Sequence, residues 1–75
     1  MLFNGLTVKT ENATIRLDYR NGEFYYASGL SYLNATLKGC KVSRPKLEMP
    51  LVFYYNADNF GTLYTSRVKE IKEDA

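Results

Sequence analysis

The chain has 75 residues, a formal net charge of +2, 45% hydrophobic residues and 24% charged residues. This length allows one domain, residues 1–75, and the balance of apolar and charged residues excludes wholesale disorder. With no histidine and one cysteine, Cys40, the chain has no internal disulfide and no usual zinc ligand set. We therefore expect no metal and no cofactor.

The first half of the chain begins with two predicted strands and a hairpin. Within residues 6–11 and 14–19 every second residue is apolar or Thr, a period typical of half-buried strands. Asn21-Gly22 follows, and this pair is a strong hairpin signal because both central residues of a type I′ turn need a positive φ. The returning strand is predicted over residues 23–27, with Phe24 and Tyr26 on one face and Tyr25 on the other.

The middle of the chain is predicted as one more strand and a connector. Residues 32–43 resume the period of two, but their apolar residues change face at Gly39. A glycine at such a phase slip is typical of a β-bulge or a barrel corner. Residues 44–50 contain two prolines, which exclude a central strand and a helix interior, so we expect an exposed connector.

The last third contains the most β-prone run, residues 51–55, followed by a predicted loop over 56–61 and a strand from Thr62 to Thr65. Beyond it the pattern is ambiguous, because Ser66 could cap a short helix. The acidic end of the chain would stand unfavourably at the terminus of that helix. We expect instead a 3₁₀ turn at residues 65–67, a short closing strand from Val68 and frayed final residues.

These elements predict an all-β fold, a small antiparallel barrel of five or six strands with one 3₁₀ turn near the C-terminus. Residues 61–71, GTLYTSRVKEI, resemble the end of SH3-like barrels, where a glycine-led strand enters a 3₁₀ turn carrying a Ser and a short Val-x-x-Ile strand closes the barrel. The resemblance implies the barrel shape alone. The chain lacks the paired Trp and the Ala-Leu-Tyr-Asp-Tyr motif of peptide-binding SH3 domains, so binding of proline-rich motifs is not implied.

Catalysis is not expected from this composition. Cys40 and the serines have no histidine to activate them, Cys40 is expected to be a small buried apolar residue, and no glycine-rich phosphate loop precedes a helix. The N-terminus does not have the pattern of a signal peptide, and no stretch is long and apolar enough to span a membrane, so a cytoplasmic protein is expected. The small size and lack of targeting resemble accessory proteins of phages and other mobile elements.

Two binding functions remain open. Seven tyrosines and an apolar strand favour a non-catalytic interaction module that binds another protein, or its own copy, through an aromatic-rich sheet surface. The alternative is a small barrel that binds nucleic acid or a nucleotide by base stacking and phosphate contacts. A continuous positive stripe would favour nucleic acid, and interleaved signs would favour protein. The candidate binding residues are Tyr25, Tyr54, Arg16, Lys41, Arg44 and Lys46, with Lys38 as a further basic residue.

Overall fold

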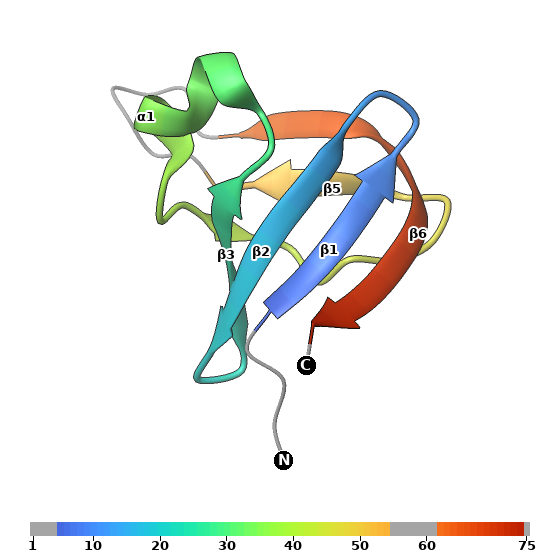
Figure 1. The fold of residues 1–75 in the computed structure, drawn as a ribbon, viewed down its shortest axis with the longest axis horizontal. Helices are drawn as coiled ribbons and strands as arrows, with labels where there is room; N and C mark the ends of the chain where they lie inside the picture. The colour runs from blue at the N-terminus through green and yellow to red at the C-terminus, as the bar shows by residue number, and fades with distance from the viewer. Residues whose placement is uncertain (1–4, 55–61, 75) are drawn as a thin grey trace.

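A computed structural model describes residues 5–54 and 62–74, which form a closed barrel of antiparallel strands (Figure 1). Strands adjacent in sequence pair with one another, and the last strand pairs with the first to close the barrel. The all-β barrel predicted from the sequence is confirmed, with six strands. They are β1 (Gly5–Thr10), β2 (Thr14–Arg20), β3 (Glu23–Ser28), β4 (Lys41–Val42), β5 (Pro50–Phe53) and β6 (Leu63–Asp74).

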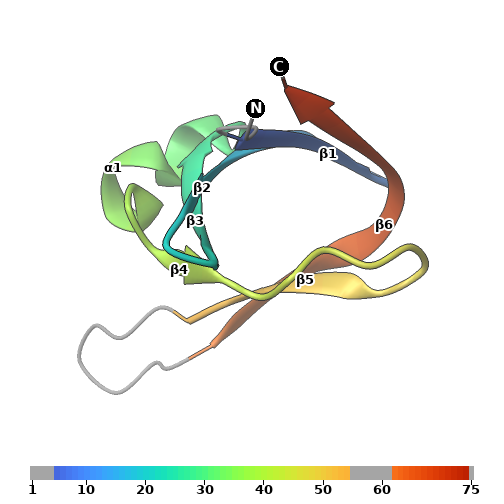
Figure 2. The same cartoon turned by 90° about the horizontal axis from the view of Figure 1, so that it is seen from below.

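The core fills the barrel interior, which the strands surround when viewed along the barrel (Figure 2). Because side chains alternate between the two faces of a strand, every second residue points inward. Burial of this apolar surface is the main favourable contribution to folding. The buried hydrophobic side chains are Leu6, Val8, Ile15, Leu17, Phe24, Tyr26, Leu37, Val42, Leu51, Phe53 and Val68.

The hairpin between β2 and β3 is confirmed. Asn21 and Gly22 have φ values of 52° and 80°, the positive angles that a type I′ turn requires. Phe24 is buried, whereas Tyr25 lies opposite Asp18 on the outer face. This turn fixes the register that brings Tyr25 to the outside of the sheet.

The strand predicted over residues 32–43 is wrong for most of its length. The structure has a 3₁₀ turn, η1 (Ser31–Leu33), and one helical turn, α1 (Asn34–Leu37), so that only Lys41 and Val42 form a strand. Leu33 and Leu37 are four residues apart, a spacing that puts two side chains on one face of a helix and also on one face of a strand. Leu37 is fully buried in the core, and this packing selects the helix.

Gly39 ends this helical segment instead of forming a bulge. Its φ is 80°, and its N–H donates to the carbonyl oxygen of Tyr26 at 3.0 Å. The N–H of Cys40 donates back to the carbonyl oxygen of Leu37 at 2.8 Å, which satisfies a free carbonyl at the helix end. A left-handed glycine after the last helical residues is a common way to stop a helix.

Between β4 and β5 the chain forms the predicted connector. Residues 44–49 contain no strand, and β5 begins at Pro50, one residue before the predicted start. The strand ends at Phe53, so Tyr54 lies just beyond it. Tyr55 and the loop predicted over 56–61 lie outside the described residues.

The 3₁₀ turn predicted at residues 65–67 is also wrong, as is a helix starting at Ser66. Strand β6 runs through this region, but its register with β5 shifts, because Pro50 pairs with Arg67 while Val52 pairs with Tyr64. One extra residue on β6 therefore forms a β-bulge. A bulge bends its strand, and β6 curves here from β5 towards β1 (Figure 1).

The closing strand is longer than predicted. We expected a short strand from Val68 with frayed residues after it, but β6 pairs with β1 as far as Asp74, which lies opposite Gly5. The paired strands satisfy their backbone groups and bring Ile71 beside Val8. Among residues 5–54 and 62–74, no helix has the length and apolar character required to cross a bilayer.

Candidate functional site

The outer side of β3, β4 and β5 carries two tyrosines with a lysine between them. Tyr25 pairs with Lys41 across β3 and β4, and the backbone N–H of Tyr54 donates to the carbonyl oxygen of Lys41 at 2.8 Å. The neighbouring residues Val42 and Phe53 are buried, so the alternation points this row outward. With neighbouring strands about 4.8 Å apart, the backbones of the two tyrosines are about 10 Å apart across the sheet.

Strand β6 extends this outer surface with a third tyrosine. Val52 and Tyr54 are two residues apart in sequence, and Tyr64 pairs with Val52 across β5 and β6. Tyr54 and Tyr64 are 51% and 66% exposed, which places them among the most exposed large hydrophobic residues described. We call this surface the tyrosine face; it consists of Tyr25, Lys41, Val52, Tyr54 and Tyr64.

Two charged contacts flank the tyrosine face. The Nζ of Lys41 lies 3.3 Å from the Glu23 carboxylate, and the guanidinium of Arg20 lies 4.5 Å from the centre of the Tyr25 ring. The first contact compensates the charge of the central lysine. The second is a cation–π contact, which orients the ring and covers one side of it.

Beside the tyrosine face lies a hollow of about 460 Å³, at the turn between β2 and β3 and the end of β4. The guanidinium of Arg44 lies over the Phe24 ring, 5.5 Å from its centre. Arg44 has no ion pair or hydrogen bond with any residue in the described part of the chain. We call this the Arg44 hollow; its walls include Glu23, Phe24, Lys41, Arg44 and Tyr54.

The structure brings four of the six candidate binding residues together: Tyr25, Lys41, Arg44 and Tyr54. The other two lie elsewhere. Arg16 is on β2, opposite Thr7 of β1 and Ser28 of β3, and Lys46 is in the connector before β5. Lys38, the additional basic residue, follows α1.

Sequence reasoning did not single out Tyr64. The signal that could have found it is alternation within the predicted strand over residues 62–65, where the apolar Leu63 would point inward and its neighbour outward. The structure has this arrangement, with Leu63 packed against the core and Tyr64 exposed.

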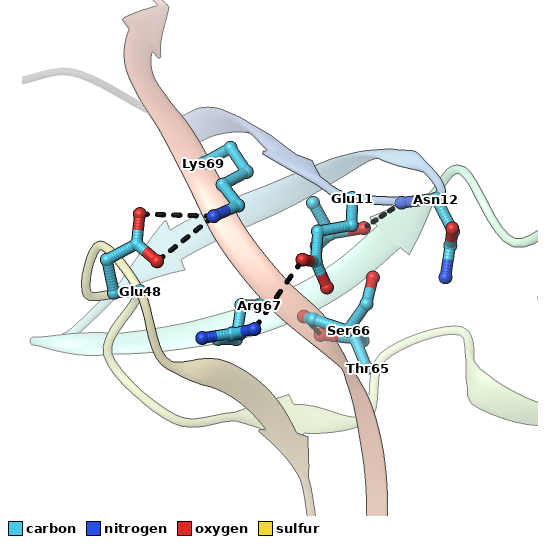
Figure 3. A network of polar contacts seen from close by, with 8 residues as sticks. Glu11, Asn12, Glu48, Thr65, Ser66, Arg67 and Lys69 are labelled. Atoms are coloured by element: carbon cyan, nitrogen blue, oxygen red, sulfur yellow. Dashed lines mark hydrogen bonds and ion pairs between the residues drawn. The ribbon is translucent and has the colours of Figure 1, made fainter.

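Positive and negative side chains lie in pairs at several places on the described surface. Four lysine or arginine side chains pair with carboxylates: Lys9 with Glu70 at 3.8 Å, Lys41 with Glu23 at 3.3 Å, Arg67 with Glu11 at 3.9 Å and Lys69 with Glu48 at 3.0 Å. Figure 3 shows the last two, which lie along β6. Exposed pairs of this kind add little stability, but each places a negative charge beside a cation.

Cys40 is partly buried and is no activated nucleophile. Its Sγ donates to the carbonyl oxygen of Lys41 at 3.5 Å, and burial raises the pKa of the thiol. A raised pKa keeps the sulfur protonated at neutral pH, where the thiol reacts slowly. Within residues 5–54 and 62–74, no group of three or more Cys, Asp or Glu side chains is arranged to hold a metal ion.

Comparison of the chain with protein-family models, with curated proteins and with solved structures gives no match. Similarity to known proteins therefore assigns no function, and the function is inferred from the geometry. The two features that enter this inference are the exposed tyrosines of the tyrosine face and the stacked, unpaired Arg44.

Proposed function

We propose that the protein is a non-catalytic interaction module, an SH3-like small barrel, that binds another protein through its tyrosine face. The exposure of Tyr54, directly after β5, and of Tyr64, on the neighbouring strand β6, carries the proposal. Large aromatic side chains gathered on one face are typical of interaction surfaces, because they supply contact area at a low cost in conformational entropy. The SH3-like assignment is supported by β6, which pairs first with β5 and then with β1.

The charge pattern supports a protein partner in preference to nucleic acid. A phosphate backbone is bound by several uncompensated cations along one track. Here Lys41, at the centre of the tyrosine face, is paired with Glu23, and Arg16 and Lys46 lie away from it. Arg20 and Arg44, which lie beside the face, are each placed over an aromatic ring. Mixed charge around aromatic residues matches the mixed surface of a protein.

The barrel closure indicates how the partner is bound. Because β6 pairs with β1, the edges of these two strands that face one another are occupied and are not open to a strand of the partner. Binding is therefore assigned to side chains of the outer face, with Tyr54 and Tyr64 as the main contacts.

A selection from a random peptide library displayed against the immobilised protein tests this proposal. Peptides recovered from it are measured against the wild type, Tyr54→Ala and Tyr64→Ala. We expect each substitution to weaken binding at least about tenfold, the equivalent of about 1.4 kcal/mol. The matched control is Leu47→Ala, which removes a side chain of similar exposure, 59%, from the connector and leaves binding unchanged.

Two outcomes would contradict the proposal. One is that the library yields no specific binder. The other is that the recovered peptides bind Tyr54→Ala and Tyr64→Ala as tightly as the wild type.

A further inference from the structure

Arg44 differs from the paired cations of the barrel in the group that it contacts. Its guanidinium rests on the Phe24 ring, whereas Lys9, Lys41 and Lys69 each face a carboxylate. Arg44 is exposed, and no described residue accepts a hydrogen bond from it. A planar guanidinium held on an aromatic ring presents a fork of N–H groups that matches a carboxylate.

The support beneath Arg44 is rigid. Phe24 is 4% exposed, and its ring packs against the Tyr19 ring with a centroid distance of 4.9 Å. The flanking backbone is also fixed, because the N–H of Ser43 donates to the carbonyl oxygen of Val52 at 2.9 Å and the N–H of Val52 donates to the Ser43 hydroxyl at 3.1 Å. An arginine held in this way loses little conformational freedom when it binds a ligand.

The charges around the Arg44 hollow leave one positive charge uncompensated. Among the described residues of its walls, Lys41 and Arg44 are the cations and Glu23 is the carboxylate, so these residues carry a net charge of +1. A singly charged carboxylate matches this charge, whereas a phosphate dianion would exceed it close to Glu23. The volume of about 460 Å³ is within the range of small-ligand sites, about 300–1,000 Å³.

We infer that the Arg44 hollow binds an acidic side chain, Asp or Glu, of the protein partner, next to an apolar residue that contacts Tyr54. This inference rests on the proposed function. Tyr54 belongs to both surfaces, since it lines the hollow and is part of the tyrosine face. The tyrosine face continues from Tyr54 to Tyr64, so the partner chain extends beyond the hollow. We assign the hollow to an internal acidic side chain, and peptides with an amidated C-terminus distinguish this from a C-terminal carboxylate.

A second hollow borders Arg44 on its other side, and its carboxylate does not pair with the Arg44 guanidinium. This hollow, of about 490 Å³, lies at one end of the barrel, and Glu73 is among its lining residues. No ion pair joins Glu73 to Arg44. The carboxylates of residues 5–54 and 62–74 therefore leave the guanidinium open to an external one.

The test uses peptides recovered from the library selection, made with an amidated C-terminus. We expect them to share an Asp or Glu at a fixed distance from an apolar or aromatic residue. Replacing that acid by its amide is expected to weaken binding to the wild type about tenfold. Arg44→Gln is expected to weaken binding of the acidic peptide to the same extent.

A double-mutant cycle separates a direct contact from an indirect effect. The variant peptide is the one in which Asn or Gln replaces the acidic residue. If the acidic side chain contacts Arg44, this variant peptide binds Arg44→Gln no more weakly than it binds the wild type, because both changes remove the same interaction. The control is Lys46→Gln, which removes the same charge from the connector and leaves binding within about twofold. Amide NMR spectra of each variant confirm that the barrel is folded.

The possible results distinguish this inference from the proposed function. If Tyr54→Ala and Tyr64→Ala abolish binding but Arg44→Gln does not, the acidic subsite is wrong and the tyrosine face remains. If Arg44→Gln abolishes binding and the tyrosine variants do not, the proposed function is wrong. Recovered peptides that need a free C-terminus, or that bind only when phosphorylated, would overturn the assignment of an acidic side chain.

Discussion

The hydroxyl of Thr65 accepts a hydrogen bond from the backbone N–H of Leu51 at 3.0 Å. The same hydroxyl donates to the carbonyl oxygen of Ser66 at 2.6 Å. A side chain thus satisfies a backbone donor at the bulge where the register between β5 and β6 shifts. Figure 3 shows Thr65 and Ser66 at this point of β6, next to Arg67.

Thr65→Val should therefore destabilise the barrel. Valine keeps the shape of the side chain but removes the acceptor, and Leu51 is fully buried, so its N–H would be left unpaired. The free energy of unfolding is expected to fall by about 1–3 kcal/mol. Urea denaturation measures the change. Thr65→Ser keeps the hydroxyl and should cost less than half as much; equal losses for the two variants would show that the hydrogen bond is not the cause.

Gly29→Ala should be the most damaging glycine substitution in the described residues. Gly29 has a φ of 124°, and a Cβ placed there would lie 2.7 Å from the Cα of Ile15 and against the carbonyl oxygen of Thr14. Both obstacles are backbone atoms of the paired strand β2, so neither can move without breaking the sheet. We expect a loss above about 3 kcal/mol, or no folded protein, in thermal unfolding.

Gly22→Ala provides the comparison for Gly29→Ala. Gly22 also has a positive φ, 80°, but nothing lies within 4 Å of its added Cβ. Its cost should therefore be only the conformational one, about 1 kcal/mol, which lowers the midpoint of thermal unfolding by about 4–8 °C. Similar midpoints for the two variants would contradict the close approach of the backbone at Gly29.

The reactivity of Cys40 should report its burial. Because burial raises the pKa of the thiol above its ordinary value of 9.0, the folded state keeps its proton at pH values where the unfolded chain has lost it. The contribution of this group to stability therefore falls as the pH rises above about 9. Alkylation by iodoacetamide should be slower in the folded protein than in urea at pH 8, with a midpoint of its pH profile above that of the unfolded chain. A midpoint at or below the unfolded one would contradict the burial.

Nucleic acid should not bind tightly. At about 50 mM salt, where phosphate contacts are strong, we expect no mobility shift with single-stranded or double-stranded DNA at micromolar protein. A shift that disappears on raising the salt concentration, and that Lys41→Ala or Arg44→Ala weakens, would favour the nucleic-acid alternative over a protein partner.

The hairpin could be predicted from the sequence because its signals are local. The period of two in residues 14–19 and the Asn21-Gly22 pair each determine the backbone without any distant contact. The segment before β4 could not be predicted in this way. Leu33 and Leu37 fit a helix and a strand equally well, and the choice depends on the core that receives Leu37.

The bulge at Thr65 also depends on a distant partner. A Thr-Ser pair is compatible with a 3₁₀ turn and with a bulge, and the N–H of Leu51, fourteen residues earlier, decides between them. In the tyrosine face, too, one feature follows from local sequence and another depends on distant contacts. Alternation predicts that Tyr25 and Tyr54 point outward, but their alignment through Lys41 depends on a strand of only two residues, β4, whose register the sequence does not specify.

The pairing of β1 with β6 affects how the molecule is made. A ribosome releases the first strand long before residues 68–74, which Val8 and its neighbours need as their partners. Until then the sheet is an open half-cylinder whose apolar concave side faces water. Since translation adds about 5–20 residues per second, this exposure lasts for seconds, and contacts between distant strands are slow to form. The growing chain is therefore most prone to aggregation immediately before its last strand emerges.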